Sequence, residues 1–384
     1  MNYIFNKIYL RLLILFGLSL IVRLVIFNFY PDQKFLDSTH YEIAGFDFFK
    51  NNFVFPTDVH MPLYPILSYL FGRTNMILID ILLSSLTTLL IYYLCLYLFD
   101  EFSALIASLI SIFYPFFIFY SLSGLTETLF IFLQLSYFIL LYKKKYIYSF
   151  ILIVLSIYVR PSLDYFYPLI IFSFLFFVHK EKPFKILKYL FLYILVYSIM
   201  LFPWWVHNYK KYDTFVRTNL ALGKLMYIGN NSLNESGGSI SGVDVDLTLS
   251  TKITNDIERY KYFTEETLDF IINNPKNFAQ LSGKRFIRFW RFYPYTNHYN
   301  NIYYSFISIV SFVPILLFSF FSLFKIGRIK IKELFPIFIT ILSLTAVHTI
   351  SISSIRYRLP LEPFLIILAS SFISINIKKL IKKN

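Results

Sequence analysis

Cysteine, glycine and charged residues are scarce in this chain of 384 residues. It has one cysteine and 11 glycines, and only 15% of its residues are charged. A single cysteine excludes a disulfide framework and a thiolate metal site within one chain, and Cys95 lies inside an apolar run, where packing is its expected role. The sequence has no glycine-rich phosphate loop of the nucleotide-binding type, so nothing indicates a soluble nucleotide donor.

Hydrophobic residues, in contrast, are abundant and form long runs. They make up 57% of the chain, against roughly 45–50% in a soluble domain. Several uncharged runs approach the ~20 residues that a helix needs to cross a bilayer, and they do not alternate with polar residues as barrel strands do. The sequence therefore predicts an integral membrane protein with an all-α fold, a polytopic bundle of transmembrane helices.

We expect about ten membrane spans. The first lies within residues 1–29, and because this run contains Arg23 and lacks a small-residue cleavage site, we expect it to remain uncleaved. The other nine are expected at residues 76–98, 102–120, 127–142, 146–159, 163–178, 186–206, 302–324, 334–352 and 359–377.

The formal net charge of +14 gives the expected orientation. The basic residues cluster in short connections at 143–145, 179–185, 325–332 and 378–383, which all fall on one side of the membrane if there are ten spans. Such a bias marks the cytoplasmic side, so it indicates orientation and not a nucleic-acid partner. We expect a bacterial inner (plasma) membrane protein whose active site faces the periplasm or the exterior.

This orientation divides the chain into three parts. Residues 1–206 form an N-terminal transmembrane module, and its first outer loop, 28–75, carries the expected catalytic residues. Residues 207–301 are polar and read as a small extracytoplasmic subdomain. Residues 302–384 contain the C-terminal transmembrane helices.

Ionisable residues at the outer ends of the apolar runs are the candidates for function. Placing an ionisable side chain in the membrane interior costs roughly several kcal/mol of free energy unless the group is paired or faces water. On the expected outer face they are Asp37, His60, Glu127, Arg160, Asp164, Arg356, Arg358 and Glu362. Their convergence beneath a polar segment is typical of an active site between lipid and water.

Structural alternatives stay open for several of these residues. Asp37 and Glu127 would each stabilise the N-terminus of a helix. Arg160 would pair with Asp164 four residues on, and Glu362 would serve as counter-ion for the arginines that precede it.

The chemistry that fits this set is transfer of a group from a lipid phosphate to an acceptor. A carboxylate within hydrogen-bond reach takes the proton of the acceptor as general base. Arginine, or protonated histidine, neutralises the charge that develops on the departing phosphate. The apolar spans would supply a groove for a polyprenyl chain.

Seven short motifs spread along the chain add a family resemblance. They are LDSTHYEIA with Asp37, HMPLYP at 60–65, SLSGLTETLF with Glu127, YVRP with Arg160, PWWVHNY at 203–209, YIGNN at 227–231 and RYRLPLEPFL at 356–365. In their order and spacing they resemble the GT-C membrane glycosyltransferases, in particular the protein mannosyltransferase branch (glycosyltransferase family 39) and bacterial relatives such as the lipid A aminoarabinose transferase.

The resemblance implies inverting transfer of a sugar from a polyprenyl-phosphate or dolichyl-phosphate donor on the outer face, without a cofactor. It implies that Asp37 is the general base or orients the acceptor. The complete set of expected site residues is Asp37 and Glu127 as catalytic groups, His60, Arg160, Arg356 and Arg358 at the donor phosphate, and Tyr41 and Tyr64 at the acceptor or sugar.

Departures from the family patterns leave the acceptor open. Protein mannosyltransferases carry an Asp-Glu pair in the first loop, whereas Asp37 is followed by Ser38, so a protein O-mannosyltransferase is not indicated. The acceptor is a glycan, a lipid or a protein. The acidic motifs of an oligosaccharyltransferase-like metal site are also not recognisable, and we predict metal independence. A lipid-linked glycan flippase or transporter and a glycan polymerase remain as alternative functions.

Overall fold

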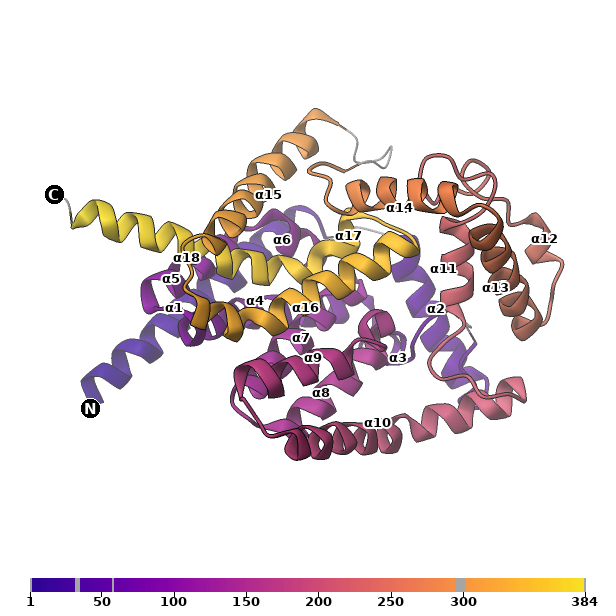
Figure 1. Cartoon of the computed structure of the whole chain (residues 1–384), viewed down its shortest axis with the longest axis horizontal. Coiled ribbons are helices and arrows are strands. Elements are labelled where there is room, and N and C mark those ends of the chain that lie inside the picture. Colours follow the sequence, from indigo (N-terminus) through magenta and orange to yellow (C-terminus); the bar gives the residue numbers. More distant parts are fainter. Residues whose placement is uncertain (1, 32–34, 57–58, 295–300, 383–384) are drawn as a thin grey trace.

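The computed structural model of the protein describes residues 2–31, 35–56, 59–294 and 301–382. Throughout these ranges the chain forms helices and loops and contains no strand, which confirms the predicted all-α fold. In Figure 1 both termini lie at one end of the molecule, and helices α11 to α14 form a cap at the other end.

Within the described ranges, six helical segments are long and apolar enough to cross a membrane, and they indicate an integral membrane protein. They are α1 (Asn2–Phe29), α4 (Arg73–Leu98), α10 (Pro183–Tyr212), α15 (Ile302–Leu323), α16 (Arg328–Ile350) and the segment Ile355–Ile381, which contains α17 (Ile355–Arg358) and α18 (Glu362–Ile381). The bent pair α5 (Glu101–Phe113) and α6 (Pro115–Ser121) would make a seventh span.

The prediction of ten spans is therefore replaced by six or seven. The remaining three expected spans are the shorter helices α7 (Thr126–Tyr142), α8 (Tyr146–Val159) and α9 (Tyr167–Ser173), the last continued by a π-helical turn to Val178. At ~1.5 Å per residue such helices fall short of the ~30 Å hydrocarbon layer. Nearly every residue of α7 is buried by other helices, so its hydrophobicity reflects packing inside the protein.

The bend between α5 and α6, 53°, is explained by a proline and a buried arginine. Pro115 has no N–H to donate to the carbonyl of Ser111, which is four residues earlier. Arg23 of α1 places its Nη2 atom 3.5 Å from that carbonyl oxygen and donates from Nε to Ser84 Oγ at 2.8 Å. Arg23 thus has a structural place, where it joins α1, α4 and the bend.

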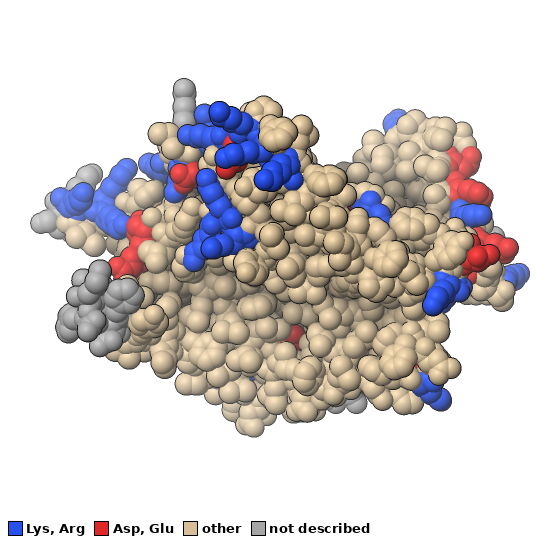
Figure 2. Space-filling model, turned by 90° about the horizontal axis from the view of Figure 1, so that it is seen from below, with Lys and Arg blue, Asp and Glu red and all other residues tan. Residues whose placement is uncertain are grey.

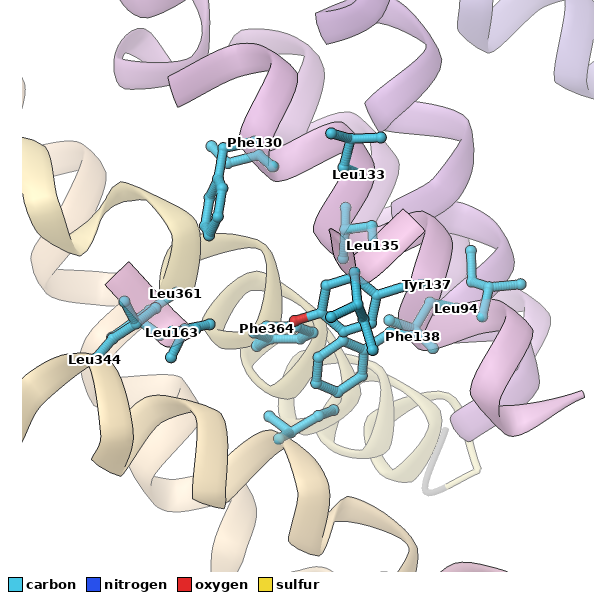
Figure 3. Packing of buried hydrophobic residues seen from close by; sticks show 14 of the residues in the cluster. Leu94, Phe130, Leu133, Leu135, Tyr137, Phe138, Leu163, Leu344, Leu361 and Phe364 are labelled. Carbon is cyan, nitrogen blue, oxygen red and sulfur yellow. The ribbon is translucent and has the colours of Figure 1, made fainter. Parts of the chain in front are cut away.

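The hydrophobic core is built around the short helices. Figure 3 shows Phe138 of α7 and Phe364 of α18 packed together among buried leucine side chains, and their ring centroids are 4.7 Å apart. Phe138 also packs edge-on against Phe174, at 5.2 Å. Cys95 is fully buried in the same cluster, which confirms its expected packing role.

The cap consists of α11 (Ala221–Gly229), α12 (Thr248–Thr251), α13 (Asp256–Asn273) and α14 (Pro275–Phe289). Because α10 continues to Tyr212, the cap begins a few residues later than the predicted boundary at 207. Helix α11 packs on α13, and α14 packs on α16, so the polar segment folds as a small subdomain on the end of the bundle.

A close backbone contact docks the cap on α16. A Cβ atom at Gly229 would lie 1.9 Å from the carbonyl oxygen of Ser351, so only glycine fits there. Beside it, Arg285 of α14 donates to the carbonyl of Gly229 and, at 2.7 Å, to that of Thr349. Burial lowers the pKa of Arg285 to about 10, which leaves it cationic at neutral pH.

The segment that was expected to be the first outer loop forms a helical hairpin between the bundle and the cap. It contains α2 (Leu36–Lys50) and α3 (Leu63–Phe71), which pack closely: a Cβ atom at Gly45 would lie 2.2 Å from the carbonyl oxygen of Pro65. This contact sets the direction of α2 and so the place of the acidic residue in its first turn.

The charges are distributed in three zones along the molecule. Figure 2 shows a broad uncharged band, with Lys and Arg gathered toward the end that holds both termini and mixed charges on the cap. An uncharged band of this kind is expected where lipid contacts the protein, and a basic excess is expected at the cytoplasmic end.

The orientation can be tested with single cysteines in a Cys95→Ala background. If the cap is external, a membrane-impermeant maleimide will label Glu265→Cys on α13 in intact cells, and will label Lys145→Cys, between α7 and α8, only after the membrane is opened. Both positions are exposed, so accessibility depends on the side of the membrane. The reverse labelling pattern would place the site on the cytoplasmic face.

Candidate active site

Four charged residues from distant parts of the chain meet at the end of the bundle next to the cap. Arg356 of α17 donates from Nη1 to Asp37 and from Nε and Nη2 to Glu127, the latter two at 2.5 and 3.3 Å. Arg160 also donates to Glu127. Glu127 therefore binds two arginines, and Arg356 binds two carboxylates.

The residues at the starts of α2 and α17 explain how the side chains of Asp37 and Arg356 are positioned. Helix α2 begins after Phe35, whose backbone N–H donates to Ser38 Oγ, so Asp37 lies in the first turn and is not the N-cap. Its carboxylate is instead directed to Arg356. Ser354 caps α17 by accepting from the backbone N–H of Arg356 at 3.4 Å, which starts the short helix that carries this arginine.

The two carboxylates differ in their access to solvent. The Glu127 side chain is 0% exposed, whereas that of Asp37 is 39% exposed. A fully buried carboxylate requires charged or hydrogen-bonding partners, and Glu127 has them in both arginines. Glu127 thus positions the arginines, and Asp37 is the carboxylate that a reactant can reach.

The accessible side of Asp37 faces a cavity of about 560 Å³ between the bundle and the cap. Its lining residues come from seven separate segments of the chain and include several charged side chains. Beside Arg356 they include Asp37, His60, Arg160, Asp164, Arg217 and Lys261. This is the first cavity, and it brings together several of the ionisable residues that were expected to converge.

The end of α10 shapes one wall of the first cavity. Trp204 Nε1 donates to the carbonyl of Thr218 at 2.6 Å, and Trp205 Nε1 donates to that of Arg217 at 2.9 Å. Asn208 Nδ2 donates to the carbonyl of Val216 at 2.9 Å. The PWWVHNY motif thus folds the following loop back on the helix and presents Arg217 to the cavity.

The same helix end also places His60. The backbone N–H of Phe55 donates to His207 Nε2 at 2.9 Å, and Asn219 Nδ2 donates to the carbonyl of Val59 at 2.6 Å. These bonds hold the segment before His60, whose ring packs edge-on against Tyr41 with centroids 4.9 Å apart. Both His60 and Tyr41 line the first cavity, as expected for site residues.

The structural alternative in which Arg160 pairs with Asp164 is contradicted by the ion pairs that form. Arg160 pairs with Glu127, and Asp164 pairs with Arg217, which donates from Nε at 2.8 Å. Tyr197 donates a further bond to Asp164 at 3.0 Å. The reason is local: Arg160 ends α8 in an extended conformation (φ −158°, ψ 113°) before Pro161, so residues 160 and 164 do not share a helical face.

A second cavity, of about 720 Å³, lies on the other side of Arg356. Arg288, Arg291 and Arg356 line it, and its described lining residues include no carboxylate. The rest of the wall is mostly aromatic and aliphatic, and includes Phe116 and Phe119 of α6. Arg356 and Tyr357 line both cavities, so the two spaces meet at the residue that holds Asp37.

Arg358 does not have the place expected for a phosphate contact. It is fully buried, donates from Nε to Glu362 at 2.8 Å and from Nη1 to the carbonyl of Arg291 at 2.6 Å, and packs 3.4 Å from the ring of Phe312. It is not among the described residues that line either cavity. Residues two apart in a helix point about 200° apart, so Arg356 faces the site and Arg358 faces the core.

Tyr64 is likewise set back from the site. Its hydroxyl donates to Asp80 of α4 at 2.7 Å, and its ring packs behind Tyr41 at 5.3 Å. Of the predicted site residues that the structure describes, the cavity linings include Asp37, Tyr41, His60, Arg160 and Arg356, and do not include Glu127, Tyr64 or Arg358.

Four basic residues of the cavities were missed in the sequence: Arg217, Lys261, Arg288 and Arg291. They lie in the polar segment between residues 207 and 301 and not at the edge of an apolar run, and basic residues are common in such a segment. For two of them the sequence carries a signal: Arg288 and Arg291 are three residues apart, near the end of α14.

Comparisons of the chain with protein-family models, with curated protein sequences and with solved structures gave no match. Among the described residues, no group of three or more His, Cys, Asp or Glu side chains is arranged to hold a metal ion, and metal independence stays a prediction.

The Arg358–Glu362 pair is expected to stabilise the fold. Arg358→Ala leaves the Glu362 carboxylate buried without its guanidinium, which typically costs about 3–5 kcal/mol and will lower the melting temperature in detergent. Lys378→Ala removes a pair with Asp100 whose side chains are 46% and 43% exposed, and such pairs contribute about 0–1 kcal/mol. Unchanged melting of Arg358→Ala would contradict the structural role.

Proposed function

We propose that the protein is a membrane glycosyltransferase of the GT-C type. It transfers a sugar from a polyprenyl-phosphate-linked donor to a cell-envelope acceptor on the outer face of the membrane. The observation that carries this proposal is the position of Asp37: its accessible carboxylate lines the first cavity and is bound by Arg356, which also lines the second, arginine-lined cavity.

In the proposed reaction, a hydroxyl of the acceptor enters the first cavity and gives its proton to Asp37. The acceptor oxygen forms a bond to the anomeric carbon of the sugar as the bond from that carbon to the phosphate oxygen breaks. The phosphate leaves with the electron pair. This single displacement inverts the anomeric configuration, and it needs a base on the acceptor side and cations on the phosphate side.

The second cavity has the chemistry that a lipid phosphate requires. Three arginines provide planar donors that bind phosphate oxygens two at a time, and no described lining carboxylate opposes them. Phe116 and Phe119 of α6 and Ile307 of α15 add apolar surface for an isoprenoid chain. Both helices belong to the membrane bundle, so a lipid would reach this cavity from the bilayer.

This assignment changes the proposed donor residues. Arg288 and Arg291 join Arg356 at the phosphate, and Arg358 is left out. His60 and Arg160 line the first cavity, on the acceptor side, with Tyr41. Glu127 acts through the two arginines that it binds.

A lipid-linked glycan flippase is the second candidate. The observation that favours it is Asp80, an acid buried within the membrane helix α4 and bonded to Tyr64, because ionisable groups inside a bilayer often mark transport pathways. A glycan polymerase would use the proposed site with a lipid-linked glycan as acceptor. The transferase is preferred because the charged residues gather at the outer end, next to the cap.

Loss of the general base will separate transfer from transport. Asp37→Asn keeps the shape of the side chain but cannot take a proton, and we expect transfer to fall by about 10²–10⁴-fold. The assay follows release of undecaprenyl phosphate from a panel of undecaprenyl-phosphate hexoses and pentoses in membranes that contain the protein.

The matched control is Glu42→Gln, which neutralises another carboxylate of α2, one that pairs with Arg73 at 3.2 Å. Transfer by this variant should be close to normal. Full transfer by Asp37→Asn would remove Asp37 as the base and favour the flippase.

Binding of the donor phosphate can be tested without knowing the sugar. Undecaprenyl phosphate should raise the melting temperature of the protein more than undecaprenol does, because only the phosphate engages the arginines. Arg288→Ala and Arg291→Ala should lose this difference, and Lys276→Ala, on α14 but not in the cavity lining, should keep it. Equal shifts from the two lipids would argue against a phosphate site.

A further inference from the structure

Arg356 is in a position to connect the two cavities. It lines both of them, and its guanidinium contacts a carboxylate on either side: Glu127 through Nε and Nη2, and Asp37 through Nη1. A phosphate in the second cavity would approach the same guanidinium. The donor and Asp37 are therefore potential competitors for one cation.

We infer that Arg356 couples the two cavities: a lipid phosphate bound in the second cavity takes the Nη1 donor of Arg356 from Asp37 and so frees the carboxylate for the acceptor. This inference rests on the proposed function. It makes the donor bind before the acceptor is activated, and it makes Arg356 a positioning residue for the base as well as a phosphate ligand.

The contacts of Arg356 differ in how easily they are exchanged. Glu127 is fully buried, so losing a guanidinium would leave its charge without compensation. Asp37 is 39% exposed, and water replaces the lost contact at little cost. An incoming phosphate will therefore displace the contact with Asp37 and leave the contact with Glu127.

Arg160 makes this exchange possible without disturbing the buried acid. It donates to the same Glu127 oxygen as Arg356 Nε, and its guanidinium lies 5.2 Å from the ring of Tyr357. Glu127 thus keeps a cationic partner that does not contact Asp37 while Arg356 turns toward the phosphate.

The geometry explains why the exchange matters for the reaction. The Asp37 oxygen that accepts from Arg356 Nη1 is Oδ2, and while it does so one of its lone pairs is engaged by the cation and is not available to the hydroxyl of an acceptor. When the guanidinium turns to the phosphate, this oxygen is exposed to the first cavity. The same cation then neutralises the charge that develops on the leaving phosphate.

The test is a double-mutant cycle on the affinity of the full chain for undecaprenyl phosphate. Asp37→Asn removes the competitor, so we expect the Kd to fall on the order of tenfold, a size of coupling that is common for residues in direct contact. In an Arg356→Ala background, the Asp37→Asn change should leave the Kd unchanged. Glu42→Gln serves as the control on α2 and should leave the Kd unchanged in both backgrounds.

A through-space repulsion between Asp37 and the phosphate predicts a different pattern of Kd values. If Asp37 only repels the phosphate through space, Asp37→Asn will tighten binding by the same factor with and without Arg356, and the inference is overturned. It is also overturned if Asp37→Asn binds no more tightly than wild type. Asp37→Glu, which keeps the competitor, should bind like wild type, and it provides a second comparison that does not depend on the folding of Arg356→Ala.

The outcomes separate this inference from the proposed function. Binding that requires the phosphate, but shows no coupling between Asp37 and Arg356, would leave the donor site in place and remove the coupling. If wild type shows no phosphate-dependent binding, the donor assignment fails and the coupling fails with it.

Discussion

The buried carboxylate of Glu127 is the constraint on which the site depends. Helix α7 is enclosed by other helices, so an ion at its start requires partners from elsewhere in the chain. Arg160 and Arg356 meet this requirement, and Asp37 balances the second positive charge, so that two acids and two arginines form a neutral set. The need to compensate one buried charge thus brings the ends of four helical elements to one point.

The cap completes the site that this network begins. Arg285 and the close approach at Gly229 dock the cap on α16, and the tryptophans at the end of α10 fold back the loop that leads into it. The bundle contributes the network around Glu127, and the cap contributes Lys261, Arg288 and the walls around them. Each cavity therefore has one side in the membrane module and one in the cap, which suits a reaction between a lipid and a polar acceptor.

Much of the architecture was predictable because hydropathy reports it directly. Every expected apolar segment is helical, and the polar segment folds as a separate cap. The number of spans was overestimated because α7, α8 and α9 are apolar but short. Helix α7 owes its hydrophobicity to burial inside the protein, an environment that hydropathy does not distinguish from lipid. Several of the ionisable residues that were expected to converge do lie together, but the alternative partner four residues from Arg160 is replaced by Glu127, which is 33 residues away.

By itself, the sequence determined a helical membrane protein with its ionisable residues concentrated at the ends of apolar segments, because the cost of placing charge in lipid acts on every residue separately. Only the tertiary structure decided which charges meet. Arg356 reaches Asp37 across 319 residues of sequence, while Arg358, two residues on, turns into the core. Ion pairs of this kind depend on distances of a few ångströms between helices, and no local pattern in the sequence records those distances.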